Sequence, residues 1–113
     1  MKNVVKMSVL SLLLTVSNAV LADAECIGEV SKLWTSADDT LYFNIVQSNA
    51  CVCNFVDNNA KGFSVPANQS NTEEQYSALL AAYMAKTAVN VSFDWAVADG
   101  SQRCMSYHIV LGS

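Results

Sequence analysis

Four cysteines restrict the fold of this chain more than any other feature. They are Cys26, Cys51, Cys53 and Cys104, in a sequence of 113 residues. Cys51 and Cys53 are separated by one residue, and a bridge between them would close a ring too strained for an extended strand. If all four are oxidised, each of these two therefore bonds to Cys26 or to Cys104. The spacing leaves open which of them takes which partner.

The N-terminus predicts that the cysteines reach an oxidising compartment. Lys2 and Lys6 precede an apolar run that ends at Val16, and Ala22-Asp23-Ala24 has the small-x-small pattern of a cleavage site. Residues 1–24 are therefore predicted to be a secretory signal peptide, with cleavage after Ala22 as the alternative. Neither this apolar run nor any later one is long enough to span a membrane. We expect a secreted or periplasmic bacterial protein, in which an even number of cysteines indicates disulfides.

The predicted mature chain, 25–113, has the size of a single domain and an acidic charge. Removing 24 of the 113 residues leaves 89, with four basic and nine acidic side chains and a net charge of −5. Nucleic-acid binding is not expected, because no cluster of lysine and arginine is present to displace counterions from phosphates. Cys51 and Cys53 with one distant histidine, His108, lack the spacing of a zinc site. Neither a metal nor a cofactor is predicted.

The segment from Thr72 to Thr87, TEEQYSALLAAYMAKT, is predicted to be a helix. Thr72 and Gln75 have the spacing of a capping box, in which each side chain satisfies a free amide of the first turn. Asn71 or Ser70 is the alternative cap. The interior is rich in alanine and leucine, which favour helix.

The predicted helix has an apolar stripe. Its members, which recur at helical spacing, are Tyr76, Leu79, Leu80, Tyr83 and Met84. We predict that Leu80 is buried against Val91, Phe93 or Ile109, together with at least one of Leu79, Tyr83 or Met84.

Short strands are predicted before and after the helix. They occupy Cys26–Thr35, Thr40–Gln47, part of Cys51–Val65, Val89–Trp95 and Met105–Leu111. Gly28 allows a bend or bulge in the first strand. The third region is broken at Asp57-Asn58-Asn59, residues that tolerate left-handed backbone geometry, and Asp99-Gly100 is a predicted turn. Trp95 continues an apolar strand face and is predicted to pack in the core.

Three strands, one helix and two strands is the element order of the oligonucleotide/oligosaccharide-binding (OB) fold, a five-stranded Greek-key barrel. In such a barrel the start of the first strand, the loop after the second and the loop before the last meet at one end. The four cysteines fall at these three places. We therefore predict a mainly β domain with one helix, built as an OB-like barrel. An α+β open sheet with one packed helix is the alternative.

The segment YSALLAAYMAKTAVNVSFDW, together with the export signal and the paired cysteines, resembles small secreted bacterial OB-fold proteins. These include the binding subunits of AB-type toxins, whose central helix is followed directly by an alternating strand. The resemblance is best from Thr72 to Trp95. It implies a ring-forming, receptor-binding protein that often recognises glycans. No sugar-contact motif matches residue by residue, so no binding residue is taken from it.

No catalytic residue is predicted. His108 is the sole histidine, and histidine is the usual general base near neutral pH. It lies on the polar face of the last strand, with no sequence elbow for a serine nucleophile nearby, and is predicted to face solvent. Glu73 and Glu74 are adjacent on the helix and point apart, so they complement the helix dipole rather than form a catalytic pair. Asp38 and Asp39 lack the ligand spacing of a calcium loop and are predicted to form a turn.

Trp34 and Tyr42 are the candidate binding platform. Trp34 ends the first strand beside a polar loop, and Tyr42 lies on the strand face opposite Leu41 and Phe43. Exposed aromatic rings of this kind stack on sugars or anchor a protein partner.

The leading hypothesis is a non-enzymatic binding module that contacts a protein or glycan and forms a homo-oligomer, similar to a toxin binding subunit. A small periplasmic inhibitor or hydrolase, whose active residues are dispersed along the sequence, is one alternative. A structural envelope protein is the other.

Overall fold

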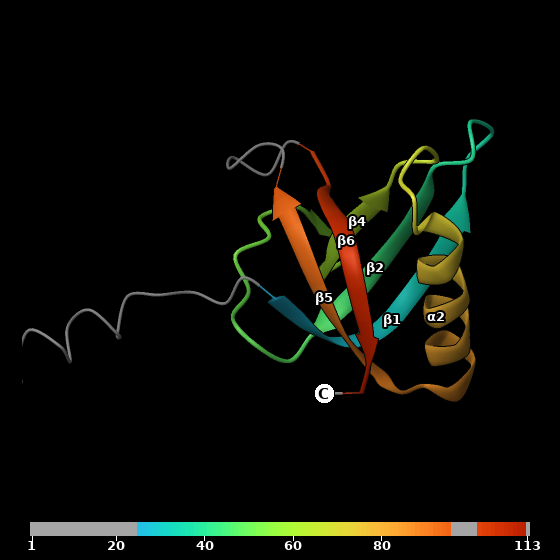
Figure 1. The fold of residues 1–113 in the computed structure, drawn as a ribbon. Helices are drawn as coiled ribbons and strands as arrows, with labels where there is room; N and C mark the ends of the chain where they lie inside the picture. Colours follow the sequence, from blue (N-terminus) through green and yellow to red (C-terminus); the bar gives the residue numbers. More distant parts are fainter. Residues whose placement is uncertain (1–24, 96–101, 113) are drawn as a thin grey trace, which may run out of the picture.

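The computed structural model describes residues 25–95 and 102–112 (Figure 1). The predicted signal peptide, 1–24, and the predicted turn at Asp99-Gly100 lie outside this part of the chain. The elements are, in order, β1 (Glu25–Thr35), β2 (Leu41–Gln47), β3 (Val56–Asp57), β4 (Ala60–Val65), α2 (Thr72–Ala85), β5 (Ala88–Trp95) and β6 (Cys104–Leu111). The side chain of Trp95 is not among the described groups, so its core position stays a prediction.

Five of the strands close into a barrel. β1 pairs antiparallel with β2 and β5, β2 pairs antiparallel with β4, and β5 pairs antiparallel with β6. A short parallel pairing of β4 with β6 completes the ring, and β3 is an extra strand on β4. This connectivity confirms the predicted mainly β fold with an OB-like barrel, and it excludes the open sheet. α2 lies beside β1 and covers one side of the barrel (Figure 1).

The barrel interior is an apolar core with three phenylalanines at its centre. The ring of Phe63 stacks on Phe43 at a centroid distance of 5.1 Å and meets the edge of Phe93 at 5.4 Å. Around them, the largest fully buried aliphatic side chains are Leu41, Ile45, Val65, Leu79, Val89 and Val91. The predicted alternation of β2 is confirmed, because Leu41, Phe43 and Ile45 all point inward.

Two disulfides tie the barrel together. Cys26 bonds to Cys51, and Cys53 bonds to Cys104, so no cysteine is free. The prediction that Cys51 and Cys53 take different partners is confirmed, and the structure supplies the pairing that the sequence left open. Two disulfides in a small domain are consistent with an extracytoplasmic location. No helix in the described ranges is long and apolar enough to cross a membrane.

β1 contains a bulge, but at Ser31 rather than at Gly28. Val30 pairs with Ile45 and Lys32 pairs with Asn44, so Ser31 is the extra residue. Gly28 has a different role. β1 is paired on both sides there, and a Cβ atom at this position would overlap the carbonyl oxygen of Val46. Glycine is therefore required for close strand approach.

The helix begins at the predicted residue, but without the predicted capping box. Asn71 is the N-cap, and its side chain makes no capping hydrogen bond. The Thr72 hydroxyl instead donates to the carbonyl oxygen of Pro66 at 2.7 Å. Gln75 is buried, where its amide donates to Asn71 Oδ1 at 3.1 Å and its carbonyl oxygen accepts from the Ser106 hydroxyl at 2.5 Å. Gln75 therefore links α2 to β6 rather than capping its own helix.

The predicted burial of Leu80 is wrong. The helix buries Gln75, Leu79 and Ala82, whereas 37% of Leu80 and 76% of Met84 are exposed. The buried face is thus turned by one residue from the predicted stripe. The polar bonds of Gln75 fix this rotation, because they require its side chain to face β6.

β6 also departs from simple alternation. Its register with β5 shifts between Ser92 and Phe93, so that Ser92 pairs with His108 and Phe93 with Ser106. Cys104 and Ser106 consequently face inward, while Tyr107 and Leu111 of the predicted apolar face are about half exposed, at 48% and 51%.

Candidate functional site

Trp34 and Tyr42 meet on the outer surface of the barrel. They are direct partners in the β1–β2 register, and their rings stack with centroids 5.4 Å apart and an interplanar angle of 21°. The bulge at Ser31 makes this possible. Before it, inward positions are Cys26, Gly28 and Val30, and without the extra residue Trp34 would also have pointed into the core. The structure therefore brings the two predicted platform residues together.

Arg103 packs against the aromatic pair. Its guanidinium carbon lies 4.9 Å from the Trp34 ring centroid, 5.6 Å from that of Tyr42 and 4.7 Å from that of Phe55. A guanidinium over an aromatic face is attracted by the negative potential of that face. Arg103 thus holds three rings from different segments in one cluster, which we call the aromatic–arginine cluster: Trp34, Tyr42, Asn44, Phe55, Asp57 and Arg103.

Hydrogen bonds fix the guanidinium in place. Arg103 donates to Asn44 Oδ1 at 2.8 Å and to Asp57 Oδ2 at 3.1 Å, and the Asn44 amide donates to the same Asp57 oxygen at 3.0 Å. Only 15% of the Arg103 side chain is exposed, compared with 31% for Asp57. The arginine charge is therefore paired and largely enclosed, so its main effect is to position the rings.

Gly62 provides the space that Arg103 occupies. Gly62 pairs with Asn44 across the β2–β4 ladder. A Cβ atom on Gly62 would come within 2.7 Å of the Arg103 guanidinium and 2.5 Å of the Phe55 ring. Since both groups lie over this backbone, a side chain here would push them away from β2. The neighbouring Cys104, in its bridge to Cys53, anchors the backbone from which Arg103 reaches across.

The sequence did not predict four of the cluster residues as site residues: Asn44, Phe55, Asp57 and Arg103. Arg103 is the only arginine of the chain and precedes a cysteine, which was the one available signal. Asn44 offered no sequence signal of a site residue, because an outward-facing strand position is usually polar. Its burial, with 2% exposed, results from the side chain of Arg103 lying over it.

The surface near the rings also carries an exposed cationic side chain. Lys32 Nζ lies 4.6 Å from the Trp34 ring centroid, and the Lys32 side chain is exposed. A ligand that stacks on Trp34 can displace this exposed side chain or accept a hydrogen bond from its ammonium group. The site thus combines apolar ring surface with a donor and, at Asp57, an acceptor.

The pKa of Asp57 is held below its usual value of 3.8, chiefly by the hydrogen bond from Asn44, with the charge of Arg103 acting in the same direction. A carboxylate whose pKa is lowered on folding contributes stability above its unfolded pKa, and this contribution is lost as the pH falls through the folded value. We expect Asp57→Asn to be less stable than wild type at neutral pH, and the difference to shrink below about pH 4. Thermal unfolding across this pH range measures it.

Asp38 is the matched control for that experiment. Its pKa is also lowered, by hydrogen bonds from Ser36 and Thr40 in the β1–β2 turn. Asp38→Asn should therefore remove the contribution of the β1–β2 turn to the pH dependence of stability, and it should leave the aromatic–arginine cluster intact. If Asp57→Asn kept the full wild-type pH dependence, Asp57 would not be coupled to the cluster as described.

The remaining candidates lie apart from the cluster. His108 is exposed on β6, as predicted, and Glu73 and Glu74 are exposed in the first turn of α2. Asn58 and Asn59 take left-handed backbone angles, with φ of 54° and 65°, in the turn from β3 to β4. The residues that the structure describes include no group of three or more His, Cys, Asp or Glu side chains arranged to hold a metal ion.

Comparison with known proteins gives no match to any family model, curated protein or solved structure.

Proposed function

We propose that this protein is a secreted or periplasmic bacterial binding module that recognises a glycan through Trp34 and Tyr42. The observation that carries the proposal is the stacking of these rings on the outer face of β1 and β2, held by Arg103. Sugars present C–H groups that pack on aromatic rings and hydroxyls that bond to nearby polar groups. Lys32 and Asp57 lie in position to supply such bonds.

Rigidity supports this assignment. Binding loses less conformational entropy when the contact surface is ordered beforehand. Arg103 bonds to Asn44 and Asp57 while contacting both rings. Apart from Arg103, all of these residues lie on paired strands rather than on a free loop. The aromatic–arginine cluster contains no histidine, cysteine or hydroxyl nucleophile other than the Tyr42 phenol, so its chemistry suits binding better than covalent catalysis.

A glycan array probed with the oxidised mature protein tests the proposal. We expect binding to a restricted set of related glycans. Trp34→Ala should weaken it by about 2 kcal/mol or more, roughly 30-fold, as for a central aromatic anchor. Trp34→Phe keeps a ring and should bind with intermediate affinity.

Tyr107→Ala is the control, since Tyr107 is an exposed aromatic residue on β6 that does not belong to the aromatic–arginine cluster. It should bind as wild type does. The proposal is contradicted if Trp34→Ala binds glycans as tightly as wild type. It is also contradicted if no glycan binds and the protein instead binds a partner protein through Trp34.

Self-association is a second proposal, and it rests on the exposed face of α2. Tyr76, Leu80, Tyr83 and Met84 recur at helical spacing, and between 37% and 76% of each is exposed. None of these four side chains is charged, so a second copy of this acidic chain could pack on the C-terminal part of the stripe, away from Glu73 in the first turn, without burying a carboxylate. Such a module would form a homo-oligomer, as the toxin binding subunits do.

Sedimentation of the mature protein tests self-association. We expect a defined oligomer, and we expect Met84→Glu to convert it to monomer because a carboxylate would be buried at the contact without a partner. Glu74→Gln, outside the stripe, should leave the assembly unchanged. A wild-type protein that stays monomeric at high concentration would contradict this proposal.

A further inference from the structure

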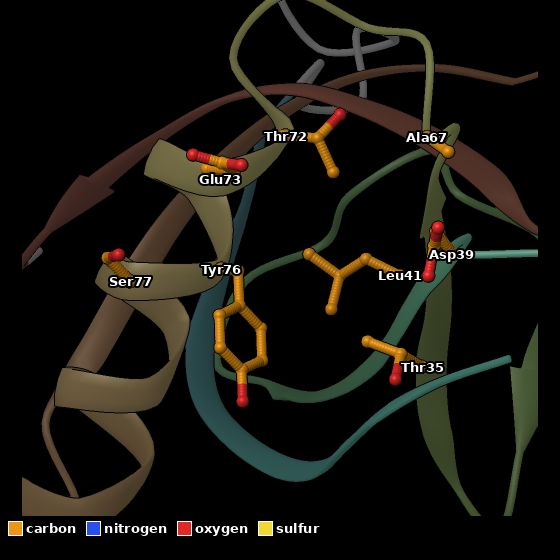
Figure 2. Close-up of a pocket in the computed structure, with 8 residues that line it drawn as sticks. All are labelled: Thr35, Asp39, Leu41, Ala67, Thr72, Glu73, Tyr76 and Ser77. Carbon is orange, nitrogen blue, oxygen red and sulfur yellow. The ribbon is translucent and has the colours of Figure 1, made fainter.

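A groove separates the N-terminal half of α2 from the turn between β1 and β2. Its volume is about 610 Å³, within the usual size range of small-molecule sites. In Figure 2, Thr35 and Leu41 approach it from β1 and β2, Asp39 from the turn between them, and Thr72, Glu73 and Tyr76 from the helix. We call this space the helix–turn groove.

The groove is distinct from the aromatic–arginine cluster. Trp34 pairs with Tyr42 on the outer face of β1 and β2, whereas the next pair, Thr35 with Leu41, belongs to the opposite face. Because successive residues of a strand point to opposite sides, the two surfaces are separated by the β1–β2 ladder. A ligand of the groove would therefore not touch the platform.

The groove combines apolar surface with two carboxylates. Leu41 and Ala67 contribute apolar atoms, and Figure 2 shows the Tyr76 ring in the gap between α2 and the strands. Asp39 lies on the turn side and Glu73 on the helix side. Within the described ranges, neither carboxylate makes an ion pair, and the lining contains no lysine or arginine.

We propose that the helix–turn groove binds a small organic cation, namely an ammonium or guanidinium group on an apolar stem. The two carboxylates would accept hydrogen bonds from the charged group, and the face of Tyr76 attracts a cation. The stem would pack on Leu41 and Ala67. This site goes beyond the proposed glycan binding, and neither proposal depends on the other.

Other ligand classes fit the groove less well. An anion would meet two carboxylates of like charge without any basic side chain to neutralise it. A neutral sugar could bond to the carboxylates and hydroxyls, but it would leave two negative charges uncompensated on a chain whose predicted mature form already has a net charge of −5. An apolar-stemmed cation satisfies both the charge and the apolar surface.

Titration of the ¹⁵N-labelled protein with agmatine, a small guanidinium-bearing amine, tests the proposal. Galactose and acetate serve as neutral and anionic probes. We expect saturable shifts of the amide signals of Asp39, Thr72 and Tyr76 with agmatine alone. Added salt should weaken the binding, since exposed charges are screened.

Two substitutions remove the carboxylates with little change in shape. Glu73→Gln and Asp39→Asn should each weaken agmatine binding by roughly two- to five-fold, the range for one exposed ion pair, and the double variant by more. Asparagine tolerates the left-handed backbone of Asp39, whose φ is 67°, so Asp39→Asn keeps the turn.

Glu74→Gln is the matched control, because Glu74 is the adjacent exposed acid and does not line the groove. It should bind agmatine like wild type, and so should Trp34→Ala, whatever its effect on glycan binding. The proposal is overturned if agmatine shifts no groove signals, if galactose binds there equally well, or if Glu74→Gln weakens binding as much as Glu73→Gln.

Discussion

Replacing Cys53 and Cys104 together by serine is expected to lower the free energy of unfolding by about 3–5 kcal/mol. This bridge spans 51 residues, compared with 25 for the bridge from Cys26 to Cys51, so its loss frees more of the unfolded chain. A small domain has only ~5–15 kcal/mol of stability in total. The variant should therefore be marginal at room temperature, as denaturant unfolding would measure.

The same variant should weaken ligand binding, because Arg103 precedes Cys104 and reaches the rings from that anchored backbone. Replacing Cys26 and Cys51 is the control. The Cys26/Cys51 variant should also be less stable than wild type. Its folded molecules, however, should keep more of the wild-type ligand affinity than those of the Cys53/Cys104 variant. Peptide mapping that joined Cys26 to Cys104 would contradict the pairing, and so would an unchanged unfolding midpoint in the Cys53/Cys104 variant.

Leu79→Ala is expected to cost about 2–5 kcal/mol, the usual range for a buried leucine whose cavity collapses incompletely. Leu79 is fully buried and belongs to the core that includes Val89 and Val91. The neighbouring Leu80→Ala has the same chemical change on the exposed face, and it should cost no more than about 0.5 kcal/mol in the monomer. Chemical denaturation of both variants at low protein concentration makes the comparison.

A concentration series separates packing from assembly. If Leu80 contributes to a subunit contact, its substitution will lower stability only where the protein associates, since assembly is then linked to folding. The cost of Leu79→Ala should be similar at every concentration. If Leu80→Ala lowered the free energy of unfolding of the monomer more than Leu79→Ala does, Leu80 rather than Leu79 would face the core. That result would contradict the helix orientation in the structure.

The fold was largely predictable because several local patterns agree. Alternation in Leu41, Phe43 and Ile45, the helical composition from Thr72 and the position of Cys104 all favour one order of elements. The helix face was not predictable from hydrophobicity. Its rotation depends on Gln75 bonding to Ser106, two polar residues that are 31 positions apart. A hydrophobicity pattern assigns both members of such a buried polar pair to the protein surface.

The candidate site was predictable only in part. Trp34 and Tyr42 could be recognised as aromatic residues near a loop, but their stacking depends on the bulge at Ser31, for which the sequence has no clear signal. Arg103 joins them from a segment 61 residues after Tyr42 and 69 after Trp34, across the gap that Gly62 leaves. Such long-range contacts arise from barrel closure, which local sequence patterns do not encode.

The central claim is that a ligand stacks on the Trp34–Tyr42 platform. It is tested most directly by titrating ¹⁵N-labelled oxidised protein with the glycan found on the array and following the indole N–H signal of Trp34, which Trp34→Phe assigns. We predict saturable shifts of this signal and of the backbone amides of Lys32, Tyr42 and Asn44. Binding that left the Trp34 indole unchanged and shifted amides of α2 instead would contradict the account.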